Sequence, residues 1–301
     1  MNFFARIILS LIGPAWSVSN KRHDDFVFIL GAGRSGNTLL RRLLMENVSI
    51  YIPPETYVLP MIARLRWLAR GLPWSIIVNV VVSSFHYHPE FKWMGGCDLS
   101  GLAVEAKGWP KAKRKVDILI IEIYRKMASF SGSDAKALGD KTPLNTLHLN
   151  GVDKLLPGAR YIYIYRDGVD VVDSYVRSGI YKGHSQAAKR WVNSIKAWRK
   201  AKDRLASNRY VEVRYEDLVK EPEKVINDLI GRLLLPKRST PIDVLEILGD
   251  VTSLDHHANA TRPPSPNSIG KGRQNIPKDK IQNVAKILNK ELLSCGYEAL
   301  R

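Results

Sequence analysis

Three short apolar runs in the chain have the length and composition of buried β-strands. The first, Phe26–Leu30, leads directly into a glycine-rich segment at residues 31–38. The second, at residues 159–165, begins after a Pro-Gly turn, and the third covers Tyr210–Arg214. Each run is followed by a stretch in which apolar residues recur at helical spacing. Strands that alternate with helices in this way predict an α/β fold, built on a parallel sheet with helices on both faces.

Four helices are predicted around these strands from the spacing of apolar residues. One begins after the glycine-rich segment, with leucines at 39, 40, 43 and 44, and a second starts near Val169. A third covers residues 186–205, and a fourth runs from about Pro222 to residue 235, because proline is favoured at the first helical position. The helix at 186–205 carries an apolar stripe and many basic side chains elsewhere, and we interpret its basic face as solvated.

A long segment separates the first two strands. It runs from about residue 52 to residue 136 and combines helical patterns with many aromatic residues, including Trp67, Trp74, Tyr87, Trp93 and Trp109. Ligand sites in open α/β sheets form beyond the carboxyl ends of the strands, so insertions at that edge shape substrate pockets. We therefore expect residues 57–136 to form a helical insertion that shapes the substrate pocket. The apolar run at 72–85 within it is too short to span a membrane, which takes about 20 residues.

The chain is expected to form a single domain over residues 1–301, with its core at about 24–297. The first 20 residues have an apolar centre without a clear cleavage site, so we interpret them as a short surface helix. Whether this segment is an anchor stays open. Residues 258–275 contain three prolines and three basic residues and are predicted to form a loop near the ligand.

Charge is the unusual feature of the composition. The 301 residues include 46 Lys and Arg against 29 Asp and Glu, which leaves a formal net charge of +17. Such an excess points to a polyanionic partner: nucleic acid, an anionic membrane surface, an acidic glycan or a multiply phosphorylated small ligand. The two cysteines, Cys97 and Cys295, are too few for a disulfide-stapled scaffold or a cysteine-based zinc site, and whether they pair stays open. The adjacent His256 and His257 are interpreted as loop residues rather than metal ligands.

The glycine-rich segment is the strongest candidate for a binding site. A strand that runs through glycines into a helix exposes backbone N–H groups at the positive end of the helix dipole, so we expect a phosphate-like anion there. The three glycines fit the dinucleotide-binding fingerprint, and Glu55 lies at about the distance of its ribose-binding acid. The segment is also a Walker A motif in which Asn37 replaces the lysine. The first interpretation is weakened by Pro53 and Pro54, which separate Glu55 from a short predicted strand at 48–52.

A third pattern accounts for these departures. The run Gly-Arg-Ser-Gly-Asn-Thr-Leu-Leu after a strand resembles the 5′-phosphosulfate loop of sulfotransferases that use 3′-phosphoadenosine 5′-phosphosulfate. In this resemblance Arg34 takes the place of the missing lysine, and the implied contacts to the co-substrate come from Gly33, Arg34, Ser35, Gly36, Asn37 and Thr38. Arg34 is also implied in catalysis.

Further segments extend the resemblance over roughly residues 26–295. The segment Tyr-Arg-Asp-Gly that ends the second strand, with a serine in the next helix, resembles the family's 3′-phosphate segment, so Arg166 and Ser174 are implied to bind that phosphate. Val-Arg-Tyr-Glu-Asp near the third strand implies a nucleotide contact by Tyr215. Ser-Ile-Gly-Lys-Gly-Arg resembles the basic C-terminal loop over the co-substrate and implies Lys271 and Arg273 as ligands, with glycine at 272 where many relatives carry an aromatic residue.

Two smaller motifs are similar to the protein-tyrosine sulfotransferase branch. They are Pro-Glu-Thr at 54–56 and Gly-Asp-Lys-Thr-Pro at 139–143. The matching glutamate of that branch is the general base and the matching lysine stabilises the leaving group, which implies these roles for Glu55 and Lys141. The fold implied is a P-loop-like parallel sheet flanked by helices, with the helical insertion forming the acceptor pocket.

The sequence therefore predicts an enzyme that moves a sulfuryl group from 3′-phosphoadenosine 5′-phosphosulfate to an acceptor hydroxyl by in-line displacement, without a metal. The acceptor is a peptide tyrosine, a sugar or a lipid-linked glycan, and no nucleic-acid partner is expected. The protein is expected in the cytoplasm, with peripheral contact to an anionic membrane left open, as is its oligomeric state. An NAD(P)-binding oxidoreductase and a basic module for nucleic acid or anionic lipid are the alternatives.

Overall fold

The structure is a computed structural model that describes residues 13–94, 96–245, 248, 250 and 261–301. Of the predicted surface helix at residues 1–20, the first twelve positions lie outside the described residues, and residues 13–20 contain no helix. These residues are held in an irregular conformation, in which the buried Trp16 side chain donates from its indole nitrogen to the carbonyl of Ala69 at 2.6 Å. His256 and His257 also lie outside the described residues.

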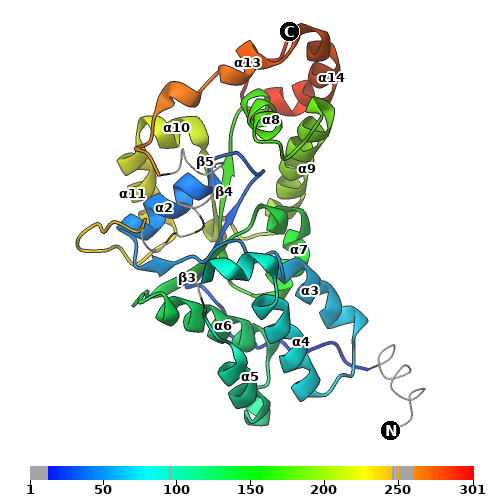
Figure 1. Cartoon of the computed structure of the whole chain (residues 1–301), viewed down its shortest axis with the longest axis vertical. Coiled ribbons are helices and arrows are strands. Elements are labelled where there is room, and N and C mark those ends of the chain that lie inside the picture. Colours follow the sequence, from blue (N-terminus) through cyan, green and yellow to red (C-terminus); the bar gives the residue numbers. More distant parts are fainter. Residues whose placement is uncertain (1–12, 95, 246–247, 249, 251–260) are drawn as a thin grey trace.

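Strands and helices alternate along the chain, as predicted (Figure 1). The strands are β1 (Phe26–Leu30), β2 (Ile50–Tyr51), β3 (Ala137–Lys141), β4 (Arg160–Tyr165) and β5 (Tyr210–Arg214). The helices are α2 (Asn37–Asn47), α3 (Leu59–Leu68), α4 (Trp74–His86), α5 (Ser100–Lys107), α6 (Val116–Phe130), α7 (Leu149–Leu155), α8 (Gly168–Arg177), α9 (His184–Lys202), α10 (Tyr215–Lys220), α11 (Pro222–Arg232), α13 (Lys271–Asn275) and α14 (Lys278–Ser294). Short 3₁₀ helices, such as Pro143–His148 and Pro266–Ser268, lie between them.

The five strands form one parallel sheet in the order β2-β3-β1-β4-β5. β1 lies at its centre, and all five of its apolar side chains are buried. From β1 the chain passes through α2 to the edge strand β2, returns to β3, and then crosses to β4 on the other side of β1. The loops that follow β1 and β3 therefore diverge, and such a switch point is where ligands bind in open α/β sheets.

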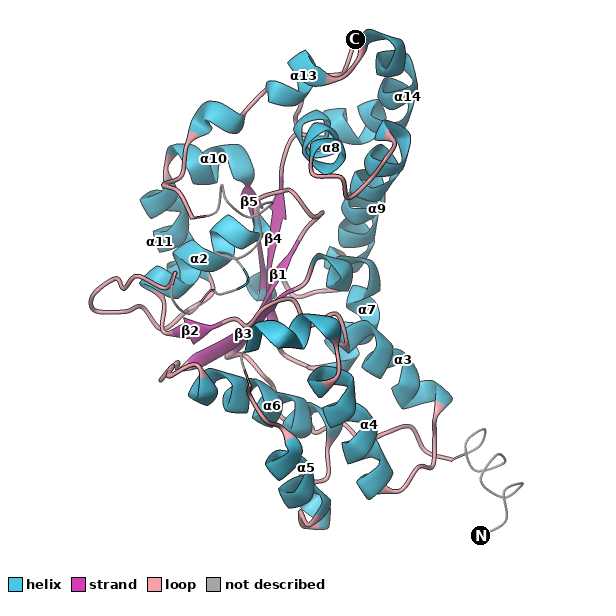
Figure 2. Cartoon of the chain, in the orientation of Figure 1, coloured by secondary structure: helices cyan, strands magenta, loops and turns pink. Residues whose placement is uncertain are grey.

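The two faces of the sheet are packed by different side chains. On one face the ring of Phe28 stacks on Tyr161 at 5.6 Å between centroids, and Tyr163 stacks on Trp198 of α9 at 4.7 Å. The alternation of a strand turns Ile164 to the other face, where it lies close to Gly36 at the start of α2. Figure 2 shows α2, α10 and α11 on one side of the sheet and α7, α8 and α9 on the other. The predicted parallel sheet with helices on both faces is confirmed.

The segment between β2 and β3 folds into four helices, α3 to α6. The Tyr124 ring of α6 packs edge-on against Phe26 of β1 at 5.0 Å. The apolar run at 72–85 becomes α4, which begins after Pro73 and turns five apolar side chains into the core. No helix among the described residues combines the length and the apolar character that crossing a bilayer takes.

The C-terminal part is more helical than the sequence suggests. Within the predicted loop at 258–275, the described residues include the 3₁₀ helix Pro266–Ser268 and the short helix α13. The longer helix α14 follows and packs along α9. Cys97 and Cys295 are both free thiols.

Candidate active site

Residues that follow β1, β2, β3 and β4 line a cavity of about 1160 Å³. Ten of the predicted site residues line it: Gly33, Arg34, Gly36, Asn37, Thr38, Glu55, Arg166, Ser174, Tyr215 and Lys271. Two more, Ser35 and Lys141, are fully buried and lie next to lining residues rather than among them. Arg273 is not among the lining residues. The structure therefore brings together residues that lie far apart in the sequence.

The glycine-rich loop turns sharply between β1 and α2. Arg34 and Gly36 have positive φ angles of 66° and 99°. A Cβ atom on Gly36 would lie 2.4 Å from the ring of Tyr215, so glycine is needed for the loop to pass this ring. Gly36 is also the N-cap of α2 and offers no side chain to cap the first N–H groups of the helix. These N–H groups and the helix dipole suit the loop for holding an anion.

Buried polar groups fix the shape of this loop. The hydroxyl of Thr146 accepts a hydrogen bond from the backbone N–H of Gly31 at 2.9 Å. Asn37 bridges the loop from within, because its Nδ2 donates to the carbonyl of Ala32 at 2.7 Å. The Ser35 hydroxyl is buried and has no hydrogen-bond partner among the described residues. A buried hydroxyl in this situation costs free energy unless a ligand engages it.

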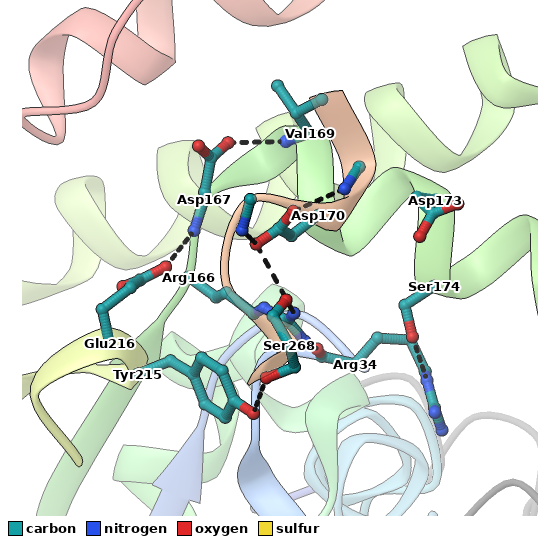
Figure 3. Close-up of polar contacts among 12 residues, drawn as sticks. Arg34, Arg166, Asp167, Val169, Asp170, Asp173, Ser174, Tyr215, Glu216 and Ser268 are labelled. Atoms are coloured by element: carbon teal, nitrogen blue, oxygen red, sulfur yellow. Dashed lines mark hydrogen bonds and ion pairs between the residues drawn. The ribbon is translucent and has the colours of Figure 1, made fainter. Parts of the chain in front are cut away.

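Two arginines from different parts of the chain converge on the loop (Figure 3). Arg34 Nε donates to the hydroxyl of Ser174 at 3.1 Å, which joins the loop to α8. Arg166 Nη1 donates to the carbonyl of Arg34 at 3.4 Å. Burial lowers the pKa of Arg34, and repulsion from Arg166 and Arg177 lowers it further. A bound anion would offset this repulsion, so the cluster favours an anionic ligand.

The Arg166 side chain is held by neighbours from three segments. Its guanidinium lies over the ring of Tyr215 at 4.4 Å, and its Nη2 donates to the carbonyl of Ser268 at 2.6 Å. The pair with Asp170, four residues on, is longer at 3.5 Å. Tyr215 is itself fixed, because its hydroxyl is hydrogen-bonded to Ser268 Oγ at 2.8 Å. Arg166 Nε is buried without a partner among the described residues, which leaves one donor for a ligand.

Asp170 fastens the C-terminal segment beside the cavity (Figure 3). Its two carboxylate oxygens accept hydrogen bonds from the backbone N–H groups of Gly270 at 2.8 Å and Gly272 at 2.7 Å. A Cβ atom on Gly272 would lie 2.3 Å from the carbonyl oxygen of Val169, so the segment approaches α8 too closely for any side chain at 272. Close backbone packing therefore explains the glycine at a position where the resemblance leads one to expect an aromatic residue.

The two basic residues predicted for this segment have different surroundings. Lys271 lines the cavity. Arg273 instead donates to the carboxylate of Asp167 at 3.1 Å and to the carbonyl of Glu298 at 2.6 Å. These contacts tie α13 to the end of the chain, and the structure does not bring Arg273 together with the other predicted site residues.

Glu55 and Lys141 form an ion pair at the cavity. Lys141 Nζ donates to Glu55 Oε1 at 2.6 Å. The Lys141 side chain is fully buried, whereas the Glu55 side chain is 17% exposed, so the carboxylate faces the cavity with the ammonium behind it. The two meet because β2, which precedes Glu55, pairs with β3, which ends at Lys141.

A buried carboxylate next to this pair, that of Asp140, joins the segment after β2 to the end of β3. Asp140 accepts hydrogen bonds from the hydroxyls of Tyr124 at 2.7 Å and Thr56 at 2.8 Å, and from Asn145 Nδ2 at 2.7 Å. The backbone N–H of Thr56 donates in turn to the hydroxyl of Thr142 at 3.1 Å. Burial raises the pKa of Asp140, although these hydrogen bonds act against the rise. This network, the Asp140 clamp, fixes the neighbours of Glu55 against the neighbours of Lys141.

Comparison with known proteins decides the family. The model of the sulfotransferase family matches residues 26–239, which include the glycine-rich loop, Glu55, Lys141, Arg166 and Tyr215. The chain belongs to the sulfotransferase family. Membership of the family was predicted from the sequence and is confirmed, and the oxidoreductase alternative is not favoured.

Named sulfotransferases show the extent of the likeness. The chain is 24% identical to the protein-tyrosine sulfotransferase of Drosophila melanogaster over 226 residues, which cover 72% of this chain and 40% of the fly protein. It is 24% identical to protein-tyrosine sulfotransferase 1 of Danio rerio over 285 residues, covering 90% of this chain and 72% of that relative. The sulfotransferase domain of the Synechococcus PCC 7002 olefin synthase superposes with a TM-score of 0.58 at 21% identity, covering 94% and 98% of the two chains. This structural likeness shows the shared fold.

The sulfotransferase cavity also has residues that the motifs do not identify. They are aromatic or basic and come from several elements: Tyr57, Trp93, Tyr175, Arg177, Tyr181 and Arg190. Tyr175 and Tyr181 pack edge to face at 5.0 Å, and burial raises the pKa of Tyr175 to about 12. Arg190 Nη1 is buried without a partner among the described residues. The sequence offered a signal for only two of these residues, Tyr57 and Trp93, through the aromatic character of the insertion. It offered none for the four that come from α8, the loop after it and α9.

Within the described part of the chain, no three His, Cys, Asp or Glu side chains gather closely enough to hold a metal ion. The basic side chains that line the cavity include Arg34, Arg166, Arg177 and Arg190.

Proposed function

We propose that this protein transfers the sulfuryl group of 3′-phosphoadenosine 5′-phosphosulfate to an acceptor hydroxyl. One observation carries the proposal: a single cavity is lined by both the anion-suited loop with Arg34 and the carboxylate of Glu55, which Lys141 pairs from behind. A nucleotide-binding protein without transfer chemistry needs only the first of these. A carboxylate with a buried lysine behind it, next to an anion site, supports proton transfer close to a developing negative charge.

The glycine-rich loop and the two arginines would hold the co-substrate. Residues 33–38 suit the 5′-phosphosulfate, since the α2 N–H groups and the Ser35 hydroxyl are available there. Arg166, whose buried Nε has no partner within the described part of the chain, and Ser174 would bind the 3′-phosphate. Tyr215 and Lys271 are candidates for contacts to the rest of the nucleotide. Arg273 would act indirectly, by holding the segment that carries Lys271.

The proposed reaction is an in-line displacement. Glu55 removes the proton of the acceptor hydroxyl, and the acceptor oxygen forms a bond to sulfur. The bond between sulfur and the bridging phosphate oxygen breaks, and its electron pair leaves with 3′,5′-bisphosphoadenosine. Lys141 and Arg34 stabilise the negative charge that grows on the leaving phosphate and its surroundings, so turnover needs no metal ion.

We propose a hydroxyl group as the acceptor and, more narrowly, the hydroxyl of a tyrosine. A hydroxyl acceptor follows from the family and the proposed base. A tyrosine acceptor is supported by the two curated relatives, which are named protein-tyrosine sulfotransferases, and by the aromatic wall of Tyr57, Trp93, Tyr175 and Tyr181. The same wall also suits a sugar ring or a lipid-linked glycan, which remain the alternative acceptors.

A melting experiment with several nucleotides tests the co-substrate. The protein is heated alone and with 3′,5′-bisphosphoadenosine, NAD, NADP or ATP. At about 100 times its dissociation constant, a ligand stabilises the native state by roughly 2.7 kcal/mol. We expect a rise in Tm with the bisphosphate that exceeds the rise with the other three.

Transfer itself is measured with labelled 3′-phosphoadenosine 5′-phosphosulfate and three acceptors: a tyrosine peptide, a soluble sugar and a glycolipid. Release of the bisphosphate together with label on one acceptor supports the proposal. Stabilisation by NAD or NADP alone would overturn the assignment of 3′-phosphoadenosine 5′-phosphosulfate as the co-substrate. Strong bisphosphate binding with no transfer to any acceptor class would overturn the proposal that the protein transfers the sulfuryl group.

A further inference from the structure

Apolar side chains are exposed on α3 and at its end. Trp67 is 47% exposed and Leu68 is 65% exposed, and Met61 is exposed one and a half to two turns before them. Positions 61, 64 and 68 lie on one face of the helix, and Arg64 is exposed between the two apolar residues. We call Met61, Arg64, Trp67, Leu68 and Arg70 the α3 surface.

The α3 surface is basic as well as apolar. The guanidinium groups of Arg66 and Arg70 lie over the ring of Trp67, at 5.2 Å and 5.3 Å from its centre. No Asp or Glu occurs in the sequence from residue 56 to residue 89, which covers all of α3 and α4. The positive charge of the arginines is therefore not compensated by any acidic residue of these two helices.

The N-terminal segment, which also lacks acidic residues, contacts the end of α3. The Trp16 N–H donates to the carbonyl of Arg66 at 3.2 Å, and the N–H of Gly71 donates to the carbonyl of Pro14 at 3.1 Å. Figure 1 shows this N-terminal segment entering beside the end of α3. The sequence has no Asp or Glu from residue 1 to residue 23, and it is rich in Phe, Ile and Leu before Gly13. Pro14 and Trp16 thus lie against the end of α3, so a second stretch of chain without acidic residues adjoins the α3 surface.

We propose that the α3 surface docks on the headgroup region of an anionic lipid bilayer. Tryptophan places an apolar ring and a polar N–H at such an interface, and leucine and methionine bury their side chains just below it. Arginine keeps its stem in the apolar layer and its charge among the headgroups, where anionic lipids attract it. A nucleic acid would use the arginines but has no place for Met61 and Leu68, so this combination fits a membrane better.

Vesicle flotation tests the docking with the full chain. The vesicles consist of phosphatidylcholine alone or of phosphatidylcholine mixed with phosphatidylglycerol. We expect binding to the mixed vesicles that weakens as salt is added. Each basic residue near an anionic bilayer contributes roughly a fivefold change in partitioning, so Arg64→Gln with Arg70→Gln should weaken binding roughly 25-fold. Leu68→Ser should weaken it roughly tenfold.

Matched control variants come from α14, which lies at the top of the molecule in Figure 1, away from α3. Lys286→Gln with Lys290→Gln removes two exposed charges, and Leu293→Ser removes an apolar side chain of 62% exposure. Both should bind mixed vesicles like the unchanged protein. Trp67→Phe should keep binding but lose part of the tryptophan quenching by brominated lipid, which locates the contact independently of affinity.

Three results would overturn the proposal. The first is undiminished vesicle binding by the α3 variants, which would assign binding to the first twelve residues or to another surface. The second is equal weakening by the α14 controls, which would mean a general charge effect. The third is a dimer in solution that Leu68→Ser dissociates, which would make the α3 surface a contact between two copies of the chain. Because none of these measurements involves sulfuryl transfer, they are independent of the proposed reaction.

Discussion

Glu55 is the residue on which the proposed chemistry depends most directly. It has the Lys141 ammonium behind it at 2.6 Å, and the Tyr57 side chain lies close enough that, after burial, the charge of Glu55 is the largest cause of the raised pKa of Tyr57. The same lysine holds the carboxylate in one position, so the acceptor meets a preoriented group.

Glu55→Gln should abolish most of the transfer and leave nucleotide binding intact. Glutamine keeps the shape of the side chain but cannot accept the acceptor proton, so turnover should fall roughly 10²–10⁴-fold. Transfer rate and bisphosphate affinity are measured on the same preparation, with the exposed Glu223→Gln as control. Near-normal transfer by Glu55→Gln would remove this residue from the chemistry.

Arg166→Ala should weaken 3′,5′-bisphosphoadenosine more than 5′-AMP, which lacks the 3′-phosphate. The loss of one charge-assisted contact costs about 1.5–3 kcal/mol. The bisphosphate affinity of Arg166→Lys should lie between those of the unchanged protein and Arg166→Ala. Lysine keeps the charge but cannot also reach the carbonyls of Arg34 and Ser268 as the planar guanidinium does. Titration calorimetry with both nucleotides checks this, and an equal loss for both would contradict the assignment to the 3′-phosphate.

At the scale of elements, predictions succeeded where a pattern was local. β1 and β5 have the predicted bounds: β1 ends where the glycine-rich loop begins, and β5 ends where Tyr215 begins α10. β2 is shorter than the predicted strand at 48–52, since the N–H of Val48 bonds to the carbonyl of Leu44 and closes α2 instead. The Asp140 clamp could not be predicted, because it arises from contacts between β3, α6 and loops far apart in the sequence. The aromatic wall could not be predicted either, because its residues come from α8 and from segments before and after it that are distant in sequence.

The Asp140 clamp predicts a loss of stability and of transfer together. Asp140→Asn gives up the charged acceptor shared by Tyr124, Thr56 and Asn145, so the free energy of unfolding should fall by about 1–3 kcal/mol. Transfer should fall as well, because Thr56 adjoins Glu55. Urea unfolding and the transfer assay measure the two effects. The exposed Asp134→Asn, three residues before β3, should change neither, and an unchanged Asp140→Asn would refute the clamp.

Gly272→Ala should loosen the C-terminal segment. The new methyl group would lie 2.3 Å from the carbonyl of Val169, and relieving such an overlap costs about 1–3 kcal/mol. As the segment moves away, Ser268 leaves Arg166 and Tyr215, so bisphosphate affinity should fall with Tm. Gly231→Ala in α11 is the control, since a Cβ there meets nothing within 4 Å, and it should be neutral or stabilising.

At the scale of the whole molecule, the buried carboxylate of Asp117 makes the stability depend on pH in the acid range. Asp117 of α6 accepts hydrogen bonds from the His23 ring at 2.8 Å and from the backbone N–H and hydroxyl of Ser19. Burial alone would raise its pKa, but these hydrogen bonds outweigh burial and lower the pKa of Asp117. The carboxylate thereby ties the N-terminal segment to the helices of the insertion.

The sign of the pH dependence follows from that lowered pKa. An acid whose pKa is lower in the folded state stabilises the fold above its unfolded value of about 3.9, and this stabilisation is lost as the pH falls through the folded pKa. Asp117→Asn should therefore cost about 1.5–3 kcal/mol at neutral pH and progressively less below about pH 4. Thermal unfolding across this pH range measures the difference, with the exposed Asp24→Asn as control. A difference that does not shrink in acid would contradict the assignment.

The central position of β1 has a consequence for how the chain folds during its synthesis. β1 ends at Leu30, but its two neighbours begin only at Ala137 and Arg160. Until both have left the ribosome, a five-residue apolar strand has two open edges, and such edges pair readily with other chains. Contacts between strands so distant in sequence also form slowly. The nascent chain is therefore open to aggregation through the edges of β1 until β4 closes the sheet around it.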